Sequence, residues 1–340
     1  MTRRPSPRAL VGPTSRYAFA LAPLAAAALW GGMFVVSKWG FSAVPPVTLG
    51  FLRVALGAAA LLAVLRAGRS RDPPAATPDG GGTGGGRRGE AWGGIARADR
   101  PRVVALGGWV TLTVAAQFVG TDLTNASQGS LLTVLTPVFT VVLGALVLGE
   151  RVTRAEAGGV ALAAVGTAVV LAGQYDLGAV ASGNAAGVAL LLVASLAWAL
   201  FTVYGAPLVR RYSALTTATY ATAAAVPMLA VCAAVELAAL GYVPGSLPTD
   251  LGAVAASGRA LLAVAYLGFG STAAAWYLWY KGLEYVSAGT VAVFFFAQPV
   301  VGAALGAALL GEHLGAGFVG GGALMALGIW IVGRDPDGDG

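Results

Sequence analysis

The sequence contains few charged residues and few of the side chains that build reactive or metal-binding centres. Charged residues make up 11% of the 340 positions, whereas a soluble domain usually has about a quarter. The single cysteine, Cys232, excludes an internal disulfide and a cysteine-rich metal site, and the single histidine, His313, excludes a histidine cluster. An enzyme would need a nucleophile, a general base or a metal triad. We therefore expect no catalytic residue, no bound metal and no cofactor.

Apolar residues are abundant instead and occur in long runs. They make up 57% of the chain, and runs of roughly 20 residues, the length that crosses a bilayer as a helix, recur from end to end. The predicted class is an all-α integral membrane protein that has the lipid bilayer as a partner. The formal charge of +6 does not indicate nucleic-acid binding, because the basic residues lie in loops beside apolar runs, as topology signals and lipid-headgroup contacts do.

The apolar runs predict ten membrane spans. The first run follows a basic tail, as a signal peptide does, but it is too long for a typical signal peptide and the next span follows closely, so we expect it to be retained. The approximate limits of the spans are 18–38, 47–65, 103–121, 126–148, 155–173, 185–206, 214–240, 260–280, 286–310 and 315–333.

The basic residues lie almost entirely on one side of the predicted spans. If the N-terminus is cytoplasmic, that side holds 18 of the 21 lysine and arginine residues, as cytoplasmic loops usually do. Arg259 and Lys38 remain near the opposite side, and Arg53 lies within a span. We therefore expect a multi-pass protein of the cytoplasmic (inner) membrane with both termini in the cytoplasm.

One apolar segment occurs twice, at a distance of about half the chain. Residues 127–151 and 287–313 each begin with Ser-x-Gly, continue as an apolar run with a proline inside it, and reach Gly-Glu at the end of that run. The interval from the proline to the glycine is twelve residues in both copies. Spans 1 and 6 also resemble each other, with Trp30 matching Trp198. This self-similarity indicates a duplicated unit.

The duplication has a consequence for topology. Ten spans in two copies give five spans per copy, and an odd number inverts the second copy relative to the first. Inverted repeats are typical of secondary transporters, in which the substrate binds near the bilayer midplane between the halves and is exposed alternately to the two sides. The sequence therefore predicts a carrier.

The chain resembles the EamA branch of the drug/metabolite transporter superfamily. The resemblance rests on LWGGMFVVSK at 29–38, on Arg53 in span 2 and on the Pro…Gly-Glu segment in both copies, and it covers nearly the whole chain. It implies a ten-helix inner-membrane carrier, usually an exporter of small metabolites, with a central cavity between the halves, and it specifies no substrate. Span 7 has no arginine matching Arg53, and the second Ser-to-Pro interval is two residues longer, so the halves need not contribute equally to the cavity.

The repeats set the predicted domain organisation. A first EamA-like five-helix repeat covers residues 18–173 and a second covers 185–333, with cytoplasmic tails at 1–17 and 334–340. Residues 67–101 form a loop rich in glycine, proline and arginine. Because this loop cannot bury apolar area, we expect it to be disordered.

Two cations are candidates for binding the solute. Arg53 lies about seven residues into span 2, some 10 Å deep at about 1.5 Å per residue, where a cation is costly unless it faces a cavity or a partner. It either holds a carboxylate or phosphate of the substrate, or it reaches outward or pairs with a carbonyl or with Asp122. Lys38 ends span 1 near the interface, where snorkelling is the alternative to substrate binding.

Aromatic and amide side chains at membrane depth are further cavity candidates. Trp30 and Trp198 lie near the middle of their spans, away from the interfacial belt where tryptophan is usual, and each N–H needs a partner. Gln117 and Gln298 also need partners at that depth. Tyr277 is a candidate from the aromatic belt of span 8. Simple packing is the alternative for the aromatic residues.

Prolines and helix-ending residues complete the list of candidates. Pro137 and Pro299 interrupt helices near the midplane, where each removes one backbone hydrogen bond, so they are hinges or static kinks. Glu150 and Glu312 follow glycines that end helices, and we interpret them as turn formers rather than as proton-coupling groups. Small residues four positions apart favour close packing within a half, with a homodimer face as the alternative: Gly302/Gly306 and Gly317/Gly321.

Together these features predict a secondary transporter that moves a small organic metabolite outward across the cytoplasmic membrane by alternating access. Arg53 alone indicates a negative group on the solute, such as that of an amino acid or another organic anion. The alternatives are a membrane-embedded transferase, whose reactive groups the sequence lacks, and a channel-like pore, for which the sequence shows no selectivity filter or ring of charges.

Overall fold

The computed structural model describes residues 15–69, 94–124, 133, 135–174, 184–241, 258–310 and 316–334. Helices and short turns make up these ranges, and no β-strand occurs within them. The all-helical class predicted from the sequence is confirmed. Most of the predicted tails and of the 67–101 loop, together with Glu312 and His313, lie outside the described residues.

The described elements follow one another in a simple order. The N-terminal part contains α1 (Ser15–Gly31), α2 (Met33–Phe41), α3 (Pro46–Arg69), η3 (Arg97–Asp99), α4 (Arg100–Leu123), α6 (Leu135–Leu143), η4 (Gly144–Leu148) and α7 (Arg154–Gln174). The C-terminal part contains α9 (Ala185–Tyr212), α10 (Ala214–Ala239), α12 (Gly258–Ala265), η5 (Tyr266–Ala274), α13 (Ala275–Leu283), α14 (Ala288–Val293), η6 (Phe294–Phe296), α15 (Ala297–Leu310) and α16 (Ala316–Arg334).

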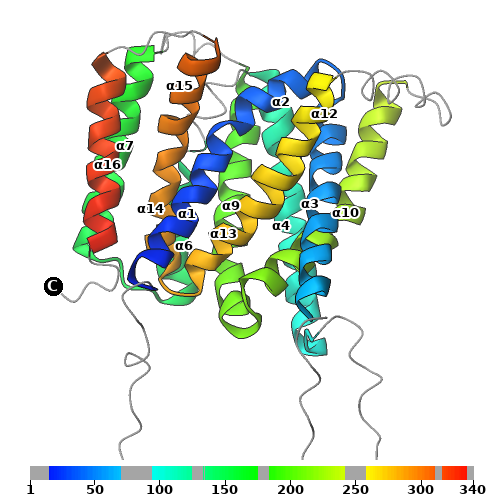
Figure 1. The fold of residues 1–340 in the computed structure, drawn as a ribbon, viewed down its shortest axis with the longest axis horizontal. Helices are drawn as coiled ribbons and strands as arrows, with labels where there is room; N and C mark the ends of the chain where they lie inside the picture. Colours follow the sequence, from blue (N-terminus) through cyan, green and yellow to red (C-terminus); the bar gives the residue numbers. More distant parts are fainter. Residues whose placement is uncertain are drawn as a thin grey trace, which may run out of the picture.

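Within the described ranges, seven helical stretches are long and apolar enough to cross a bilayer. They are Ala20–Phe41, Pro46–Gly68, Arg97–Leu123, Ala185–Tyr212, Ala214–Ala239, Gly258–Leu283 and Ala316–Arg334. Two further apolar helices, Leu135–Leu148 and Ala288–Gly302, are shorter. The helices run side by side in one bundle (Figure 1). Helices suit a hydrocarbon environment because their backbone groups hydrogen-bond within the same segment.

Helices of the N-terminal part pack mainly against helices of the C-terminal part. α1 packs on α13, α3 on α10, α4 on both α9 and α10, and α6 on α9 and α14. α7 and α16 form the most extensive helix pair, at the edge of the bundle in Figure 1. The two parts of the chain therefore share one hydrophobic core and do not form separate bundles.

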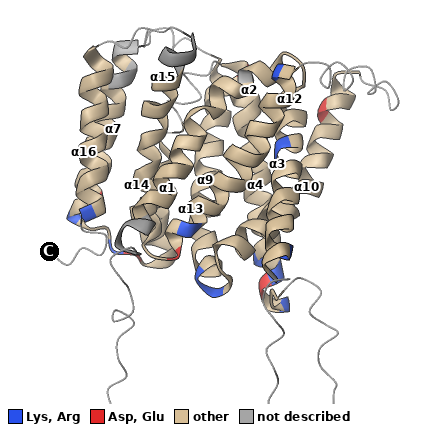
Figure 2. Ribbon diagram, in the orientation of Figure 1, with Lys and Arg blue, Asp and Glu red and all other residues tan. Residues whose placement is uncertain are grey.

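Lysine and arginine gather at one end of the bundle, the end at which α1 begins and α16 ends (Figure 2). Arg210 and Arg211 lie in the last turn of α9, Lys281 in the last turn of α13 and Arg334 in the last turn of α16. We call this end the basic end. Its position follows from the sequence, because the basic residues lie just beyond the apolar runs.

Glycines let neighbouring helices approach closely. A Cβ built on Gly328 of α16 would lie 2.6 Å from the carbonyl oxygen of Gly159 on α7, and one built on Gly302 of α15 would lie 3.0 Å from the carbonyl oxygen of Gly31 on α1. In a membrane, helix association depends on such close packing because lipid offers no hydrophobic driving force. Glycine at these positions is therefore a packing requirement.

Replacing Gly328 by alanine should destabilise the α7–α16 pair. The added methyl meets backbone and cannot be accommodated by a rotamer change, and overpacking of this kind costs about 1–3 kcal/mol. Gly322→Ala is the matched control on the same helix, because nothing lies within 4 Å of its Cβ position and the gain in helix propensity is the same. We expect thermal unfolding in detergent to show a lower midpoint for Gly328→Ala than for Gly322→Ala; equal midpoints would contradict the packing argument.

Candidate functional site

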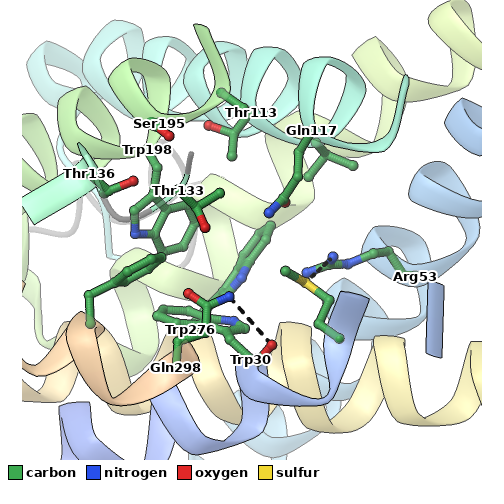
Figure 3. Close-up of a pocket in the computed structure, with 14 residues that line it drawn as sticks. Trp30, Arg53, Thr113, Gln117, Thr133, Thr136, Ser195, Trp198, Trp276 and Gln298 are labelled. Carbon is green, nitrogen blue, oxygen red and sulfur yellow. Dashed lines mark hydrogen bonds between the residues drawn. The ribbon is translucent and has the colours of Figure 1, made fainter. Parts of the chain in front are cut away.

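A cavity lies inside the bundle, between helices of the N-terminal and C-terminal parts (Figure 3). Its volume, counted as the space that the centre of a water molecule can occupy, is about 30 Å³. On the same scale one water needs about 10–15 Å³. In this conformation the cavity has room for a few waters and not for an organic solute. The polar lining is Arg53, Thr113, Gln117, Thr133, Thr136, Ser195 and Gln298, and the apolar lining is Trp30, Met33, Val114, Ala194, Trp198, Trp276 and Phe295.

Arg53, on α3, is a buried cation with no carboxylate beside it in the described part of the chain. The residue is 2% exposed. Its Nε donates to the Thr272 hydroxyl at 2.9 Å, Nη1 donates to the Met33 sulfur at 2.9 Å and Nη2 donates to the Ser271 carbonyl at 3.3 Å. The guanidinium carbon lies 5.3 Å from the centre of the Phe118 ring. No carboxylate in the described part of the chain forms an ion pair with Arg53.

These neutral contacts satisfy only part of the guanidinium group. A guanidinium has five N–H donors, and a thioether sulfur is a weak acceptor. Three of the donors of Arg53 are used, one of them on sulfur. Asp122, which the sequence offered as a partner, is exposed and forms no ion pair with Arg53. Arg53 therefore neither reaches outward nor pairs with Asp122; it bonds a carbonyl and lines the cavity.

Two of the three hydrogen-bond partners of Arg53, Ser271 and Thr272, lie in η5, a π-helical segment that the sequence pattern did not predict. At its end the Ala275 amide donates to the carbonyl of Gly270, five residues back, where an α-helix would span four. Such segments occur often at functional sites. Gly57, on α3, has no side chain, and this lets α3 approach η5 closely. A Cβ built on Gly57 would lie 2.5 Å from the Thr272 methyl group. The run Gly-Phe-Gly-Ser-Thr at 268–272 was the available signal in the sequence.

Aromatic rings form the apolar wall of the cavity. Trp30 and Trp198 meet edge to face with ring centres 5.1 Å apart, and Trp198 and Trp276 lie 5.6 Å apart. Phe295 lies 5.5 Å from Trp30. Each such pair contributes about 0.5–1.5 kcal/mol. Trp30 Nε1 also donates to the Ser271 carbonyl at 2.9 Å, so one carbonyl oxygen holds both Trp30 and Arg53 in place.

Three buried polar atoms of the lining have no hydrogen-bond partner among the described residues. They are Trp198 Nε1, Thr113 Oγ1 and Gln298 Oε1. The other end of the Gln298 amide is engaged, since Nε2 reaches the Trp30 carbonyl at 3.5 Å. A buried polar atom without a partner costs about 1–3 kcal/mol. Waters or a solute inside the cavity would offset this cost.

Most of the residues that the sequence singled out as cavity candidates meet at this one place. Trp30, Arg53, Gln117, Trp198 and Gln298 all line the cavity. In Figure 3 the amides of Gln117 and Gln298 and the guanidinium of Arg53 come from different helices toward the same space.

The remaining two cavity candidates, Lys38 and Tyr277, are not among the described lining residues. Tyr277 is half-buried and is not part of the lining; its neighbour Trp276 lines the cavity. The backbone of Lys38 belongs to α2, but its side chain lies outside the described residues. Phe295 belongs to the buried core and lines the cavity as well.

The hydroxyl residues Thr113, Thr133, Thr136 and Ser195 were not anticipated at all. Threonine and serine recur throughout the apolar spans and often bond back to their own helix, as the Ser195 hydroxyl does to the Leu191 carbonyl. Nothing in the one-dimensional pattern distinguishes those that face a cavity.

Both predicted hinge prolines follow a residue of the cavity lining. Pro137 is buried, is the third residue of α6 and follows Thr136; Pro299 is buried, is the third residue of α15 and follows Gln298. Because Pro299 has no N–H, it cannot bond to the carbonyl four residues back, and the chain tightens into the 3₁₀ turn η6 just before it. Pro299 therefore marks a change of helix type beside the cavity, whereas the residue two positions before Thr136 lies outside the described part of the chain.

Comparison with known proteins identifies the family. The sequence profile of the EamA-like transporter family matches twice, over residues 17–172 and 185–334. The chain belongs to the EamA-like transporter family. The resemblance drawn from the sequence is confirmed, and with it the description as a membrane transporter.

Individual relatives agree with this membership. An uncharacterized transporter of Archaeoglobus fulgidus is 26% identical over 306 residues, covering 90% of this chain and 95% of its own. The putative permease-like protein YdzE of Bacillus subtilis is 46% identical over 67 residues, covering 20% of this chain and 86% of its own. A crystal structure with 21% sequence identity superposes with a TM-score of 0.68 and covers 95% of this chain and 98% of its own. The fold is therefore shared with a solved protein.

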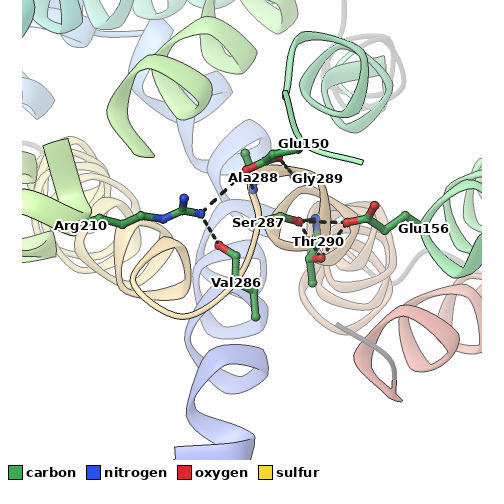
Figure 4. Close-up of polar contacts among 8 residues, drawn as sticks. All are labelled: Glu150, Glu156, Arg210, Val286, Ser287, Ala288, Gly289 and Thr290. Carbon is green, nitrogen blue, oxygen red and sulfur yellow. Dashed lines mark hydrogen bonds and ion pairs between the residues drawn. The ribbon is translucent and has the colours of Figure 1, made fainter. Parts of the chain in front are cut away.

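This EamA-family protein has a second polar site, at the basic end (Figure 4). Glu150 follows Gly149, which takes a left-handed conformation with φ 67° and ends the helix as predicted. The carboxylate of Glu150 accepts hydrogen bonds from the backbone N–H groups of Ala288 at 3.1 Å and Gly289 at 3.4 Å, at the start of α14. Arg210 lies 3.8 Å from the same carboxylate. Glu150 is thus more than a turn former.

Glu156 strengthens the same junction. Its backbone and carboxylate form reciprocal bonds with Thr153 of 3.0 and 3.1 Å, which cap α7. Its other oxygen accepts from the hydroxyls of Ser287 at 3.0 Å and Thr290 at 2.8 Å. Ser287 in turn caps α14, since it accepts from the Thr290 amide at 3.0 Å. Two carboxylates of the N-terminal part therefore hold the start of a helix of the C-terminal part.

A similar contact lies at the opposite end of the bundle. Glu236, near the end of α10, accepts from the amides of Val47 at 2.8 Å and Thr48 at 2.7 Å, and from the Thr48 hydroxyl at 2.8 Å. These groups are the first turn of α3, whose partial positive charge favours an anion. At each end, a carboxylate from one part of the chain therefore caps a helix of the other part.

Removing the Glu150 carboxylate should loosen the junction at the basic end. Glu150→Ala leaves two N–H groups of α14 without their acceptor, and loss of such a cap costs about 1–2 kcal/mol. The contact to Arg210 adds little, because Arg210 is 50% exposed and the separation is 3.8 Å. We expect a lower thermal midpoint in detergent for Glu150→Ala and no change for Asp122→Ala, an exposed carboxylate control. An unchanged midpoint for Glu150→Ala would show that the junction contributes nothing to stability.

Proposed function

We propose that this protein is a secondary transporter that carries a small organic metabolite, an amino acid or another organic anion, outward across the cytoplasmic membrane by alternating access. The observation that carries the proposal is Arg53, a buried cation without a described carboxylate partner in a cavity between the two matched segments. Family membership supports transport of small solutes and favours a transporter over an enzyme.

The chemistry of Arg53 favours an anionic solute. A cation at membrane depth is costly and characteristically faces a cavity or a partner on a substrate pathway. A carboxylate would accept from the donors of Arg53 that remain unused and would form charge-assisted bonds, which are about twice as strong as neutral ones. The aromatic wall formed by Trp30, Trp198 and Trp276 suits the apolar remainder of such a solute.

Alternating access is supported by the arrangement of the chain. In the proposal, ten spans form two inverted five-helix repeats, 18–173 and 185–333, with cytoplasmic tails at 1–17 and 334–340. Helices of the two parts pack against one another, α1 begins and α16 ends at the same end of the bundle, and the cavity between them is too small for an organic solute. We propose that the parts move to admit a solute, with Pro137 and Pro299 as the hinges.

The basic end is the proposed cytoplasmic end, because lysine and arginine are retained on that side of membranes. Here Glu150 and Glu156 join the two parts through the first turn of α14. We assign closure of the cytoplasmic side to this junction, and closure of the other side to the contact between Glu236 and α3.

Replacing Arg53 should strongly reduce transport. Cells that overexpress the wild-type protein should show one or more metabolites lowered inside and raised outside, and the same solutes should exchange by counterflow in proteoliposomes. Arg53→Gln keeps a donor for Thr272 but loses the charge; we expect counterflow to fall by about 10- to 100-fold, as loss of a hydrogen bond to a charged group implies.

The matched control is Arg259→Gln, an exposed arginine on α12, which should transport as the wild type does. Size-exclusion profiles of the variants show whether each folds. Wild-type counterflow by a well-folded Arg53→Gln protein, or the absence of any metabolite shift on overexpression, would remove the basis of the proposal.

The junction at the basic end should control access from the cytoplasm. In a Cys232→Ala background, Ser195→Cys places a thiol in the cavity lining. Adding Glu150→Ala should raise the rate of labelling by a water-soluble thiol reagent about fivefold from the cytoplasmic side, as about 1 kcal/mol of lost closure implies, and not from the other side. Asp122→Ala should leave the rate unchanged. An equal increase from both sides would argue for general loosening instead of a gate.

A further inference from the structure

The unsatisfied polar atoms of the cavity carry information about the solute beyond its charge. Trp198 Nε1 can only donate a hydrogen bond, and a carbonyl oxygen such as Gln298 Oε1 can only accept one. Both are buried, in residues 6% and 2% exposed, and neither has a partner among the described residues. The hydroxyl of Thr113, which can donate or accept a hydrogen bond, is also buried without a partner among the described residues.

The two orphan groups have opposite hydrogen-bonding character. A bare carboxylate, which is only an acceptor, can satisfy Arg53 and Trp198 but leaves the Gln298 oxygen unpaired. A solute without an acceptor leaves Trp198 and the unused donors of Arg53 unpaired. Each unmatched group costs about 1–3 kcal/mol. A site of this kind discriminates strongly against an analogue that lacks one polar group, because the group of the protein is then buried without a partner.

One long hydrogen bond, of 3.5 Å, orients the amide of Gln298. Its Nε2 donates to the Trp30 carbonyl, and this contact holds the amide so that Oε1 is the atom left without a partner. The next residue is Pro299, at the start of α15, so the backbone on which Gln298 sits is bent beside the cavity. Figure 3 shows the amide among the lining side chains, with the Trp30 contact drawn.

We propose that Gln298 is a specificity-determining residue that selects a small carboxylate, anionic or zwitterionic, which also carries an N–H or O–H donor. In this arrangement the carboxylate binds Arg53, the donor binds Gln298 Oε1, and Trp198 Nε1 donates to a second acceptor, either of the solute or of a water beside it. Amino acids and hydroxy acids fit this class, and simple carboxylates of the same shape do not. The inference rests on the proposed function in placing the solute in this cavity.

Matched acids test the selection directly. Binding to the purified full-length protein in detergent can be followed by calorimetry and by tryptophan fluorescence, since three tryptophans line the cavity. The probes are three sets: L-alanine, lactate and propanoate; L-leucine, 2-hydroxy-4-methylpentanoate and 4-methylpentanoate; and L-phenylalanine, 3-phenyllactate and 3-phenylpropanoate. In at least one set the wild type should bind an amino or hydroxy acid about tenfold or more tightly than the plain acid.

The variants separate the role of Gln298 from that of Arg53. Gln298→Met keeps the side-chain length and removes the acceptor. The ratio of the affinity for the amino or hydroxy acid to the affinity for the plain acid should therefore fall to about one, while the plain acid still binds. Arg53→Gln should weaken both acids together. Tyr277→Phe, outside the lining, should preserve both the affinities and the ratio.

Several results would overturn the proposal: equal wild-type binding within every set, no binding in any set, or an unchanged ratio in Gln298→Met. A failure of the proposed selection by Gln298 can be distinguished from a failure of the proposed transport function. If the metabolite comparison identified a transported solute that has no hydrogen-bond donor, the proposed selection would be wrong, but the proposed transport function would still be supported. If the acids bound selectively but never exchanged by counterflow, the carrier would be wrong and the selection would stand.

Discussion

A guanidinium group inside an apolar bundle needs hydrogen-bond acceptors or ring faces as partners, and several helices supply them to Arg53. The π-helical segment η5 supplies a carbonyl and a hydroxyl, α2 supplies a thioether, and Phe118 supplies a ring face. None of these groups carries a negative charge. These contacts stabilise the cation within the bundle and use three of its five N–H donors. The same carbonyl oxygen of Ser271 holds Trp30, so the charge and the aromatic wall are positioned together.

Charged residues have a different role at the ends of the bundle, where carboxylates cap helices. Three helices begin at a carboxylate that comes from elsewhere in the chain: α14 at Glu150, α3 at Glu236 and α10 at Glu284. A helix start exposes N–H groups that have no partner within the helix, and its dipole favours an anion. In the proposed transport cycle, contacts of this kind close one side of the bundle and break when a solute binds. They suit a molecule in which two packed parts move relative to each other.

Several features could be read from particular residues before the structure was known. The family followed from the order and duplication of Trp30, Arg53 and the proline segments, none of which is specific alone. Arg53, Gln117 and Gln298 were identifiable because a charge or an amide at membrane depth needs a partner. The Ser-x-Gly signature of the second copy was visible too, although its reason was not: Ser287 caps α14, and a Cβ on Gly289 would lie 3.2 Å from the Glu156 carboxylate.

The sequence by itself determined that this is a helical membrane protein of the EamA-like family with its basic residues at one end, because apolar run length, charge position and duplication are properties of the chain in one dimension. Only the tertiary structure decided which polar residues meet. Tyr277 and Trp276 are neighbours in sequence, yet only Trp276 lines the cavity, since a rotation of about 100° per residue separates their directions on a helix. The π-helical turn that holds Arg53 and the carboxylates that cap distant helices likewise depend on contacts across the bundle, which no local pattern encodes.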